Sequence, residues 1–296
     1  MKTQLTDNLK ELHLAAMRGC FEEQARQAQQ ESQSYERYLL GLTEREIQAR
    51  RGRRIERLLR ESRLPPGKDL QALDLKRLPP KVVQQIRALT DGAFADRCEN
   101  VLAFGNPGSG KTHVLSAISH ELIRSGRRVY FRNCGLMVQD LLAAKRDLKL
   151  SRYFKSLTRY EVLVLDDLGY VQQGRDEMEV LFSLLAERYE RGSVLLSSNL
   201  AFSGWEAIFK DAMMTAAAID RLVHHCVILE LNVPSYRAEQ AKKVRQTPAA
   251  AESQPADASG KNNDRRPGIL IDANQYLTVR VCRGQKTNPR HTVTSR

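Results

Sequence analysis

The first sixty residues of the chain carry apolar side chains at helical spacing. Between Thr6 and about Arg63, apolar residues recur at this spacing from Leu9 to Met17, from Tyr35 to Leu42 and from Ile47 to Leu59, and the span has no proline. Such a period places apolar side chains on one face of a helix. The sequence Leu-Pro-Pro-Gly at residues 64–67 then interrupts the pattern. We therefore predict a helical domain over residues 1–68, followed by a linker and lead-in over residues 69–99.

From Asn100 onward, short apolar runs alternate with longer amphipathic segments. This alternation is typical of an α/β fold in which helices cover both faces of a parallel sheet. The expected strands are residues 101–104, 128–132, 162–165, 194–197 and 227–231. The expected helices are residues 111–125, 136–146, 177–191 and 216–225. We place this α/β domain at residues 100–245, and the residues 246–296, which are poor in large apolar side chains at their start, are predicted to form a disordered basic tail.

The net charge of +12 is concentrated at the two ends of the chain. Residues 1–68 hold 14 Lys and Arg against 10 Asp and Glu, residues 69–241 hold 22 against 21, and residues 242–296 hold 11 against 4. A polyanion is therefore expected to bind outside the nearly neutral middle of the chain.

Arginine dominates the last predicted helix of the amino-terminal domain. Charge runs often form no more than a solvated helix face, but arginine without lysine favours contact with phosphate groups. The candidate residues for binding DNA are Arg50, Arg51, Arg53, Arg54 and Arg57.

Targeting, membrane and disulfide signals are missing from the sequence. No apolar run approaches the roughly 20 residues that span a bilayer, and the first residues lack the apolar centre of a secretory signal. The five cysteines are scattered and form no Cys-x-x-Cys pair, which argues against a disulfide framework or a zinc site. We therefore expect a cytoplasmic protein that does not contact a membrane.

A glycine-rich loop lies between the first predicted strand and helix of the α/β region. Its pattern, Gly-x-x-x-x-Gly-Lys-Thr, is typical of a P-loop, because glycines let backbone amides surround phosphates at the start of a helix. A glycine-rich turn without a ligand is the alternative, which the strand and helix context disfavours. We expect Lys111 to reach the β- and γ-phosphates of ATP and the Thr112 hydroxyl to bind Mg²⁺. The predicted nucleotide contacts are Gly105, Asn106, Pro107, Gly108, Ser109, Gly110, Lys111, Thr112 and His113.

Two aspartates follow the apolar strand predicted at residues 162–165. At the carboxyl end of that strand, Asp166 is placed to hold Mg²⁺ together with Thr112, and Asp167 to polarise the attacking water. Taken alone, the pair would equally well form a turn or a helix cap. Together with the upstream glycine-rich loop, it is interpreted as the acidic motif of an ATPase.

Asn199 and Arg221 complete a predicted catalytic set with Asp167. Asn199 follows the strand predicted at residues 194–197, where its amide could orient the attacking water, although asparagine in a loop is often a turn former. Arg221 lies in a predicted helix and could reach the ATP of a neighbouring subunit. The alternative for Arg221 is a surface ion pair.

With these motifs in place, the chain resembles the IstB-like ATP-binding proteins, the helper ATPases of insertion-sequence transposition, which are related to DnaC helicase loaders in the AAA+ class. The resemblance covers about residues 5–245. It rests on four motifs, Gly105 to His113, Leu165-Asp166-Asp167-Leu168-Gly169, Ser198-Asn199 and Ile219-Asp220-Arg221-Leu222. It implies an AAA+ core behind a small all-helical domain, with Asn199 as sensor 1 and Arg221 as the arginine finger. It also implies self-assembly on double-stranded DNA and regulation of a transposase.

Two departures and two alternative functions accompany this resemblance. Asp167 stands where most AAA+ proteins have glutamate, which predicts slow hydrolysis, and no helical lid is evident after Glu239. A DnaC-like helicase loader is the second hypothesis, and the density of arginine favours the duplex binder over it. A third is a module that binds ATP for assembly without hydrolysing it. The favoured interpretation is a DNA-stimulated ATPase that serves as a transposition helper.

Overall fold

The computed structural model describes residues 2–169, 174–209 and 211–239. By its internal contacts the chain divides into two units, Met1–Pro248 and Ala249–Arg296. The tail predicted over residues 246–296 lies outside the described residues. Within the described part, no helix is both long enough and apolar enough to span a bilayer.

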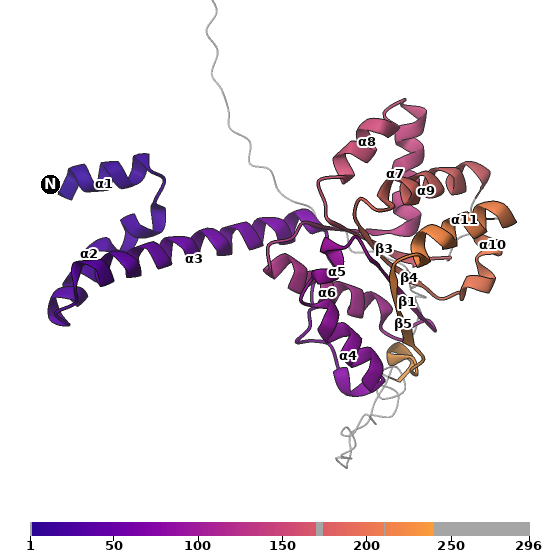
Figure 1. The fold of residues 1–296 in the computed structure, drawn as a ribbon, viewed down its shortest axis with the longest axis horizontal. Coiled ribbons are helices and arrows are strands. Elements are labelled where there is room, and N and C mark those ends of the chain that lie inside the picture. The colour runs from indigo at the N-terminus through magenta and orange to yellow at the C-terminus, as the bar shows by residue number, and fades with distance from the viewer. Residues whose placement is uncertain (1, 170–173, 210, 240–296) are drawn as a thin grey trace, which may run out of the picture. The chain divides into compact units, whose positions relative to one another are not determined.

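Three helices open the chain, which agrees with the helical domain expected there (Figure 1). They are α1 (Lys2–Glu11), α2 (Ala15–Gln30) and α3 (Tyr35–Ser62). Ser34 starts α3 by accepting a hydrogen bond from the amide of Arg37. A small core of Met17, Phe21 and Leu42 joins α2 to α3.

The last turns of α3 belong to the core of the α/β part. Leu58 is buried in the same cluster as side chains of the sheet and of α6 (Lys111–Arg124). Arg54 donates a hydrogen bond to the carbonyl of Gly126, just after α6, at 3.1 Å. The long helix therefore connects the amino-terminal helices directly to the core around the sheet.

The lead-in over residues 69–99 is more ordered than a linker. It contains η1 (Leu75–Arg77), α4 (Pro80–Leu89) and α5 (Ala93–Asp96). Proline is favoured in the first turn of a helix because its missing N–H would have no partner there. The Pro79-Pro80 pair thus starts α4 besides making a turn, and α4 packs against the core.

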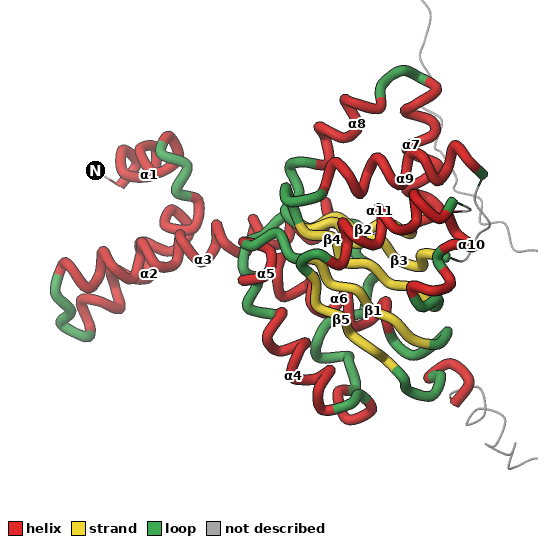
Figure 2. The backbone as a smooth tube through the Cα atoms, turned by 45° about the vertical axis from the view of Figure 1, so that its right-hand side comes forward, coloured by secondary structure: helices red, strands yellow, loops and turns green. Residues whose placement is uncertain are grey.

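The sheet is parallel throughout and follows the order β2-β3-β4-β1-β5 (Figure 2). Its strands are β1 (Asn100–Gly105), β2 (Val129–Asn133), β3 (Val162–Leu168), β4 (Ser193–Ser198) and β5 (Cys226–Leu231). The remaining described helices are α7 (Cys134–Arg146), α8 (Leu150–Leu157), α9 (Arg175–Arg188), η2 (Phe202–Gly204), α10 (Glu206–Phe209) and α11 (Ala212–Val223). The predicted parallel sheet flanked by helices is confirmed, and α8 and α10 are additional to the predicted helices.

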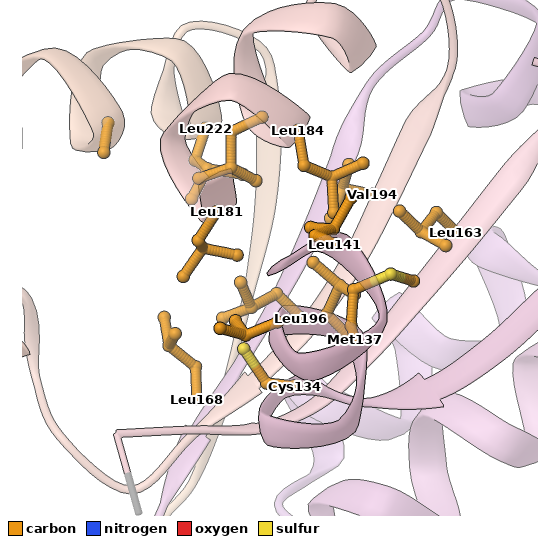
Figure 3. Packing of buried hydrophobic residues seen from close by; sticks show 14 of the residues in the cluster. Cys134, Met137, Leu141, Leu163, Leu168, Leu181, Leu184, Val194, Leu196 and Leu222 are labelled. Carbon is orange, nitrogen blue, oxygen red and sulfur yellow. The ribbon is translucent and has the colours of Figure 1, made fainter. Parts of the chain in front are cut away.

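Alternate residues of each strand face opposite layers of helices. Val162 and Val164 belong to the core beneath α4 and α6, whereas Leu163 and Leu165 belong to the core beneath α7, α9 and α11. Figure 3 shows this second core, in which side chains of α7 meet the strands. Because every strand runs the same way, the carboxyl ends of β1, β3 and β4 lie at one edge of the sheet, where open α/β folds bind ligands.

Candidate nucleotide-binding site

The loop between β1 and α6 has a backbone that requires glycine. Gly105, Gly108 and Gly110 have φ angles of 154°, 81° and 97°. A Cβ atom on Gly105 would lie 2.5 Å from the carbonyl oxygen of Leu231, and one on Gly108 would collide with the hydroxyl of Ser235. Nothing lies within 4 Å of such an atom on Gly110, so there the φ angle alone favours glycine.

The loop forms a cradle for an anion at the start of α6. The buried Lys111 ammonium donates hydrogen bonds to the carbonyls of Gly105 at 2.8 Å and Asn106 at 3.2 Å. Burial lowers the pKa of Lys111, and the negative charges of Asp167 and Asp166 act against this shift. The Ser109 hydroxyl is buried and has no partner among the described residues. A phosphate group fits this cradle because a helix amino terminus, an ammonium and an orphan hydroxyl converge there.

Thr112 and Asp166 meet at the place where the sequence predicts Mg²⁺. Asp166 Oδ1 accepts a hydrogen bond from Thr112 Oγ1 at 3.0 Å and another from Ser197 Oγ at 2.6 Å. Mg²⁺ in phosphate sites commonly uses one or two protein oxygens together with phosphates and waters, so this pair fits the ion. Ser197 was missed in the sequence, because its contact arises from the pairing of β3 with β4.

Asp167 faces the nucleotide cavity from the end of β3. Its backbone is left-handed, with φ of 61°, and its amide donates to Ser197 Oγ at 2.8 Å. Burial raises the pKa of the Asp167 carboxyl and the neighbouring Asp166 raises it further, while Lys111, Arg237 and Lys68 lower it. The carboxylate therefore lines the cavity with three basic side chains near it, and its role in polarising water stays a prediction.

The cavity is about 730 Å³ in volume and has three walls. One wall is the glycine-rich loop with Asp167 beside it, the second runs from Pro66 into the lead-in as far as Leu78, and the third is the segment after β5, from Val233 to Arg237. Sequence reasoning found the first wall only. It missed Lys68, Arg77, Tyr236 and Arg237, whose approach depends on the folding of distant segments.

Arg77 ties the second wall to the third. Its guanidinium forms an ion pair with Glu239 at 2.9 Å and lies 5.0 Å from the centre of the Tyr236 ring. The amide of Tyr236 in turn donates to the carbonyl of Gly108 at 3.0 Å. The segment after β5 is thus fastened both to the lead-in and to the glycine-rich loop.

His113 links the lead-in to α6. Its Nε2 lies 3.1 Å from the carbonyl oxygen of Asp69, and its side chain lines the cavity. The predicted nucleotide contacts Pro107, Gly108, Ser109 and Gly110 also line it, together with Lys111 and Thr112.

Asn199 and Arg221 are not among the described residues that line the cavity. Asn199 follows β4, and its buried Oδ1 has no hydrogen-bond partner in the described part of the chain. Arg221 lies on α11, with its guanidinium 4.5 Å from the centre of the Phe182 ring and a hydrogen bond to the carbonyl of Ala217. Their catalytic roles stay predictions.

Three of the five arginines predicted to bind DNA already have partners inside the chain. Arg50 and Arg53 contact the buried carboxylate of Glu46 at 2.9 Å and 3.3 Å, and Arg54 contacts the carbonyl of Gly126. Glu46 also accepts hydrogen bonds from two amides at the start of α2. Arg51 and Arg57 are exposed, and neither forms an ion pair with another described residue. The structure therefore assigns a structural contact to Arg50, Arg53 and Arg54.

A parallel sheet with a glycine-rich loop after β1 and paired aspartates after the apolar run of β3 defines a P-loop nucleotide-binding protein with the AAA+ fold. Within this class, the chain belongs to the IstB-like ATP binding protein family, whose model matches residues 7–244. The family match confirms the resemblance found in the sequence and identifies ATP as the ligand of the family.

Curated relatives from bacteria and several solved structures are similar to this chain. A putative insertion sequence ATP-binding protein of Sinorhizobium fredii is 41% identical over 246 residues, which cover 82% of this chain and 83% of the relative. An insertion sequence putative ATP-binding protein of Geobacillus stearothermophilus is 33% identical, covering 82% and 96%. DnaA from Aquifex aeolicus bound to AMPPCP has a TM-score of 0.50 at 14% identity, covering 66% and 58%. This last likeness shows the fold alone.

Proposed function

We propose that this chain is a DNA-stimulated ATPase that assembles with further copies of itself on double-stranded DNA and regulates a partner transposase. The observation that carries the proposal is the cavity in which Lys111, Thr112 and Asp167 converge at one edge of the sheet. The names of the insertion sequence relatives support the link to transposition.

In the proposed reaction, the residues in and beside the cavity have separate tasks. The Lys111 ammonium leaves the loop carbonyls and binds the β- and γ-phosphates, whose oxygens replace those carbonyls as acceptors. Thr112 and Asp166 would hold Mg²⁺, which would supply positive charge beside the phosphates. The Asp167 carboxylate accepts a hydrogen bond from the attacking water and orients it toward the γ-phosphate. Lys68 and Arg237 add positive charge near the phosphates.

Asn199 and Arg221 are proposed to complete this reaction. Asn199 follows β4, the strand between β1 and β3, and its buried Oδ1 has no hydrogen-bond partner among the described residues. Its side-chain amide is proposed to orient the attacking water. Arg221 is proposed to act on the ATP of a neighbouring subunit, because its side chain packs outside the cavity of its own chain. This role requires an oligomer.

The decisive experiment combines ATP binding with assembly on DNA. Replacing Lys111 by Ala should abolish ATP binding and ATP-dependent assembly on duplex DNA, measured by nucleotide titration and by light scattering after size-exclusion chromatography. Lys81→Ala, which removes an exposed lysine of α4, is the matched control and should behave as the wild type. Unchanged assembly of the Lys111→Ala protein would refute the proposed role of the cavity.

A further inference from the structure

Six exposed basic residues gather on two elements of the structure. Three belong to the end of α3 and three to α8 and the residues just after it. Within the described residues, none of the six forms an ion pair, whereas Arg50 and Arg53 do. The two rows, which we name the basic surface, consist of Arg57, Arg60, Arg63, Arg152, Lys155 and Arg159.

A cavity of about 430 Å³ separates the two rows. Arg60, Arg63 and Arg159 line it together with one carboxylate, Glu61, and its floor contains Tyr130 and Tyr160. These two tyrosines are only 7% and 5% exposed, so their rings are part of the core. The cavity thus has a rim of three arginines and one glutamate around a buried aromatic floor.

The floor holds two arginines in fixed positions. The Arg63 guanidinium lies 5.5 Å from the centre of the Tyr130 ring. The Arg159 guanidinium lies 4.9 Å from the centre of the Tyr160 ring and donates to its hydroxyl at 2.9 Å. The two rings are themselves 5.0 Å apart. Because the rings already restrict these guanidinium groups, less conformational entropy is lost when an anion binds them.

The basic surface lies away from the ATP cavity. Tyr130 is near the amino end of β2 and Tyr160 precedes β3, so the floor is at the edge of the sheet opposite to Thr112 and Asp166. The described residues that line the two cavities have no member in common. The two sites can therefore be changed separately by mutation.

We propose that the basic surface binds the phosphate backbone of duplex DNA, an inference that rests on the proposed function above. Arg57 and Arg60 on α3 are three residues apart, as are Arg152 and Lys155 on α8, a spacing of roughly 5 to 6 Å on a helix that suits a continuous polyanion. Arg63 and Arg159 follow the ends of these helices. Guanidinium forks also match phosphate oxygens. DNA bound here would break no internal ion pair, unlike DNA bound to Arg50 or Arg53.

An acidic protein segment is the competing ligand, and two observations disfavour it. Protein interfaces are centred on aromatic or apolar side chains that the partner can cover. Here the aromatic side chains Tyr130 and Tyr160 are almost fully buried within the chain. The charges also extend beyond the cavity on both rows, farther than a single carboxylate group would need.

The test measures the salt dependence of duplex binding by the full chain with ATP and Mg²⁺. The variant Arg60→Ala/Arg63→Ala/Arg159→Ala should reduce the slope of log K against log salt concentration by roughly 2 to 3, since each phosphate contact contributes about 0.9. The matched control, Arg97→Ala/Arg124→Ala/Arg191→Ala, removes three exposed arginines that already pair with carboxylates. It should keep the wild-type slope, and both variants should bind ATP normally.

Two further variants show whether the alanine substitutions lower the slope by removing charge or by disturbing the fold. Arg152→Ala/Lys155→Ala changes only exposed side chains of α8 and should reduce the slope by roughly 1 to 2. Replacing Arg60, Arg63 and Arg159 by lysine keeps the charges and should retain the wild-type slope.

Four results would overturn the inference. The first is an equal slope for the wild type and both alanine variants of the basic surface. The second is a reduction of the slope in the arginine control that equals the reduction in the cavity variant. A loss of polyglutamate binding in the cavity variant with an unchanged DNA slope would assign the surface to an acidic protein instead. If the wild type itself fails to bind duplex DNA, the proposed function fails together with this inference.

Discussion

Asp167 illustrates how one residue is both costly for folding and suited to catalysis. Burial raises the pKa of its carboxyl, with Asp166 adding to the effect, so the ionised form is less favourable in the folded chain than in the unfolded one. A raised folded pKa means that this residue favours folding below its ordinary pKa of 3.8 and loses that contribution as pH rises through the folded value. At neutral pH the charge therefore opposes folding.

Replacing Asp167 by Asn should separate these two effects. We expect turnover to fall by roughly 10²- to 10⁴-fold because the group that polarises water is lost, while ATP binding is retained. The variant should unfold at a higher temperature than the wild type at neutral pH, and this gain should disappear in acid. Turnover assays, ATP titration and thermal unfolding at several pH values measure the three quantities.

The exposed carboxylate of Asp7 offers a matched control for this change. Asp7→Asn should leave turnover and ATP binding unchanged. The acidic limb of the wild-type rate profile should also lie above the ordinary pKa of aspartate, because the folded pKa of Asp167 is raised. Full turnover by Asp167→Asn would exclude this residue as the group that activates water.

At the scale of elements, one arginine connects the third wall of the cavity to the second. Arg77 holds the segment after β5 through Glu239, Tyr236 and the carbonyl of Pro234. That segment carries Arg237, which contributes positive charge beside Lys111 and Asp167. The short segment after β5 therefore forms one side of the cavity, with Arg237 on it.

Arg77→Ala should release this segment and weaken ATP binding by about tenfold, which corresponds to about 1.4 kcal/mol. The rate of turnover at saturating ATP should change much less, because Asp167 and Thr112 keep their positions on β3 and α6. Isothermal titration and steady-state kinetics distinguish the two effects. Arg87→Ala on the neighbouring α4 is the control, and equal affinities for the two variants would disprove the role of Arg77.

Elements were predictable from the sequence where the signal was local. The strands are short apolar runs, and the glycine-rich loop with Lys111 and Thr112 is contained in eight residues. By contrast, α8 has eight residues and no side-chain cap, so its start has no clear sequence signal. The contact of Arg77 with the carbonyl of Pro234 joins positions 157 residues apart, and only the folded chain brings them together.

At the scale of the whole molecule, Arg221 marks where one subunit is proposed to need another. Its guanidinium rests on Phe182 of α9 and does not line the cavity formed by the described residues of its own chain. The finger role, which the sequence predicts from the family resemblance, therefore requires a neighbouring subunit to supply the group. A subunit that lacks only the arginine and a subunit that lacks only the catalytic aspartate should therefore restore turnover when they meet in one oligomer.

Mixing two inactive variants tests this directly. Arg221→Ala keeps a complete ATP cavity, and Asp167→Asn keeps its arginine, so each should be inactive alone while still binding ATP. In mixed oligomers, interfaces that join an Arg221→Ala cavity to an Asp167→Asn neighbour should recover turnover, about a quarter of the wild-type rate for random pairing. A mixture of the double variant Asp167→Asn/Arg221→Ala with Arg221→Ala has no such interface and should stay inactive. Failure to recover turnover, although both variants assemble on DNA, would place the action of Arg221 within its own chain.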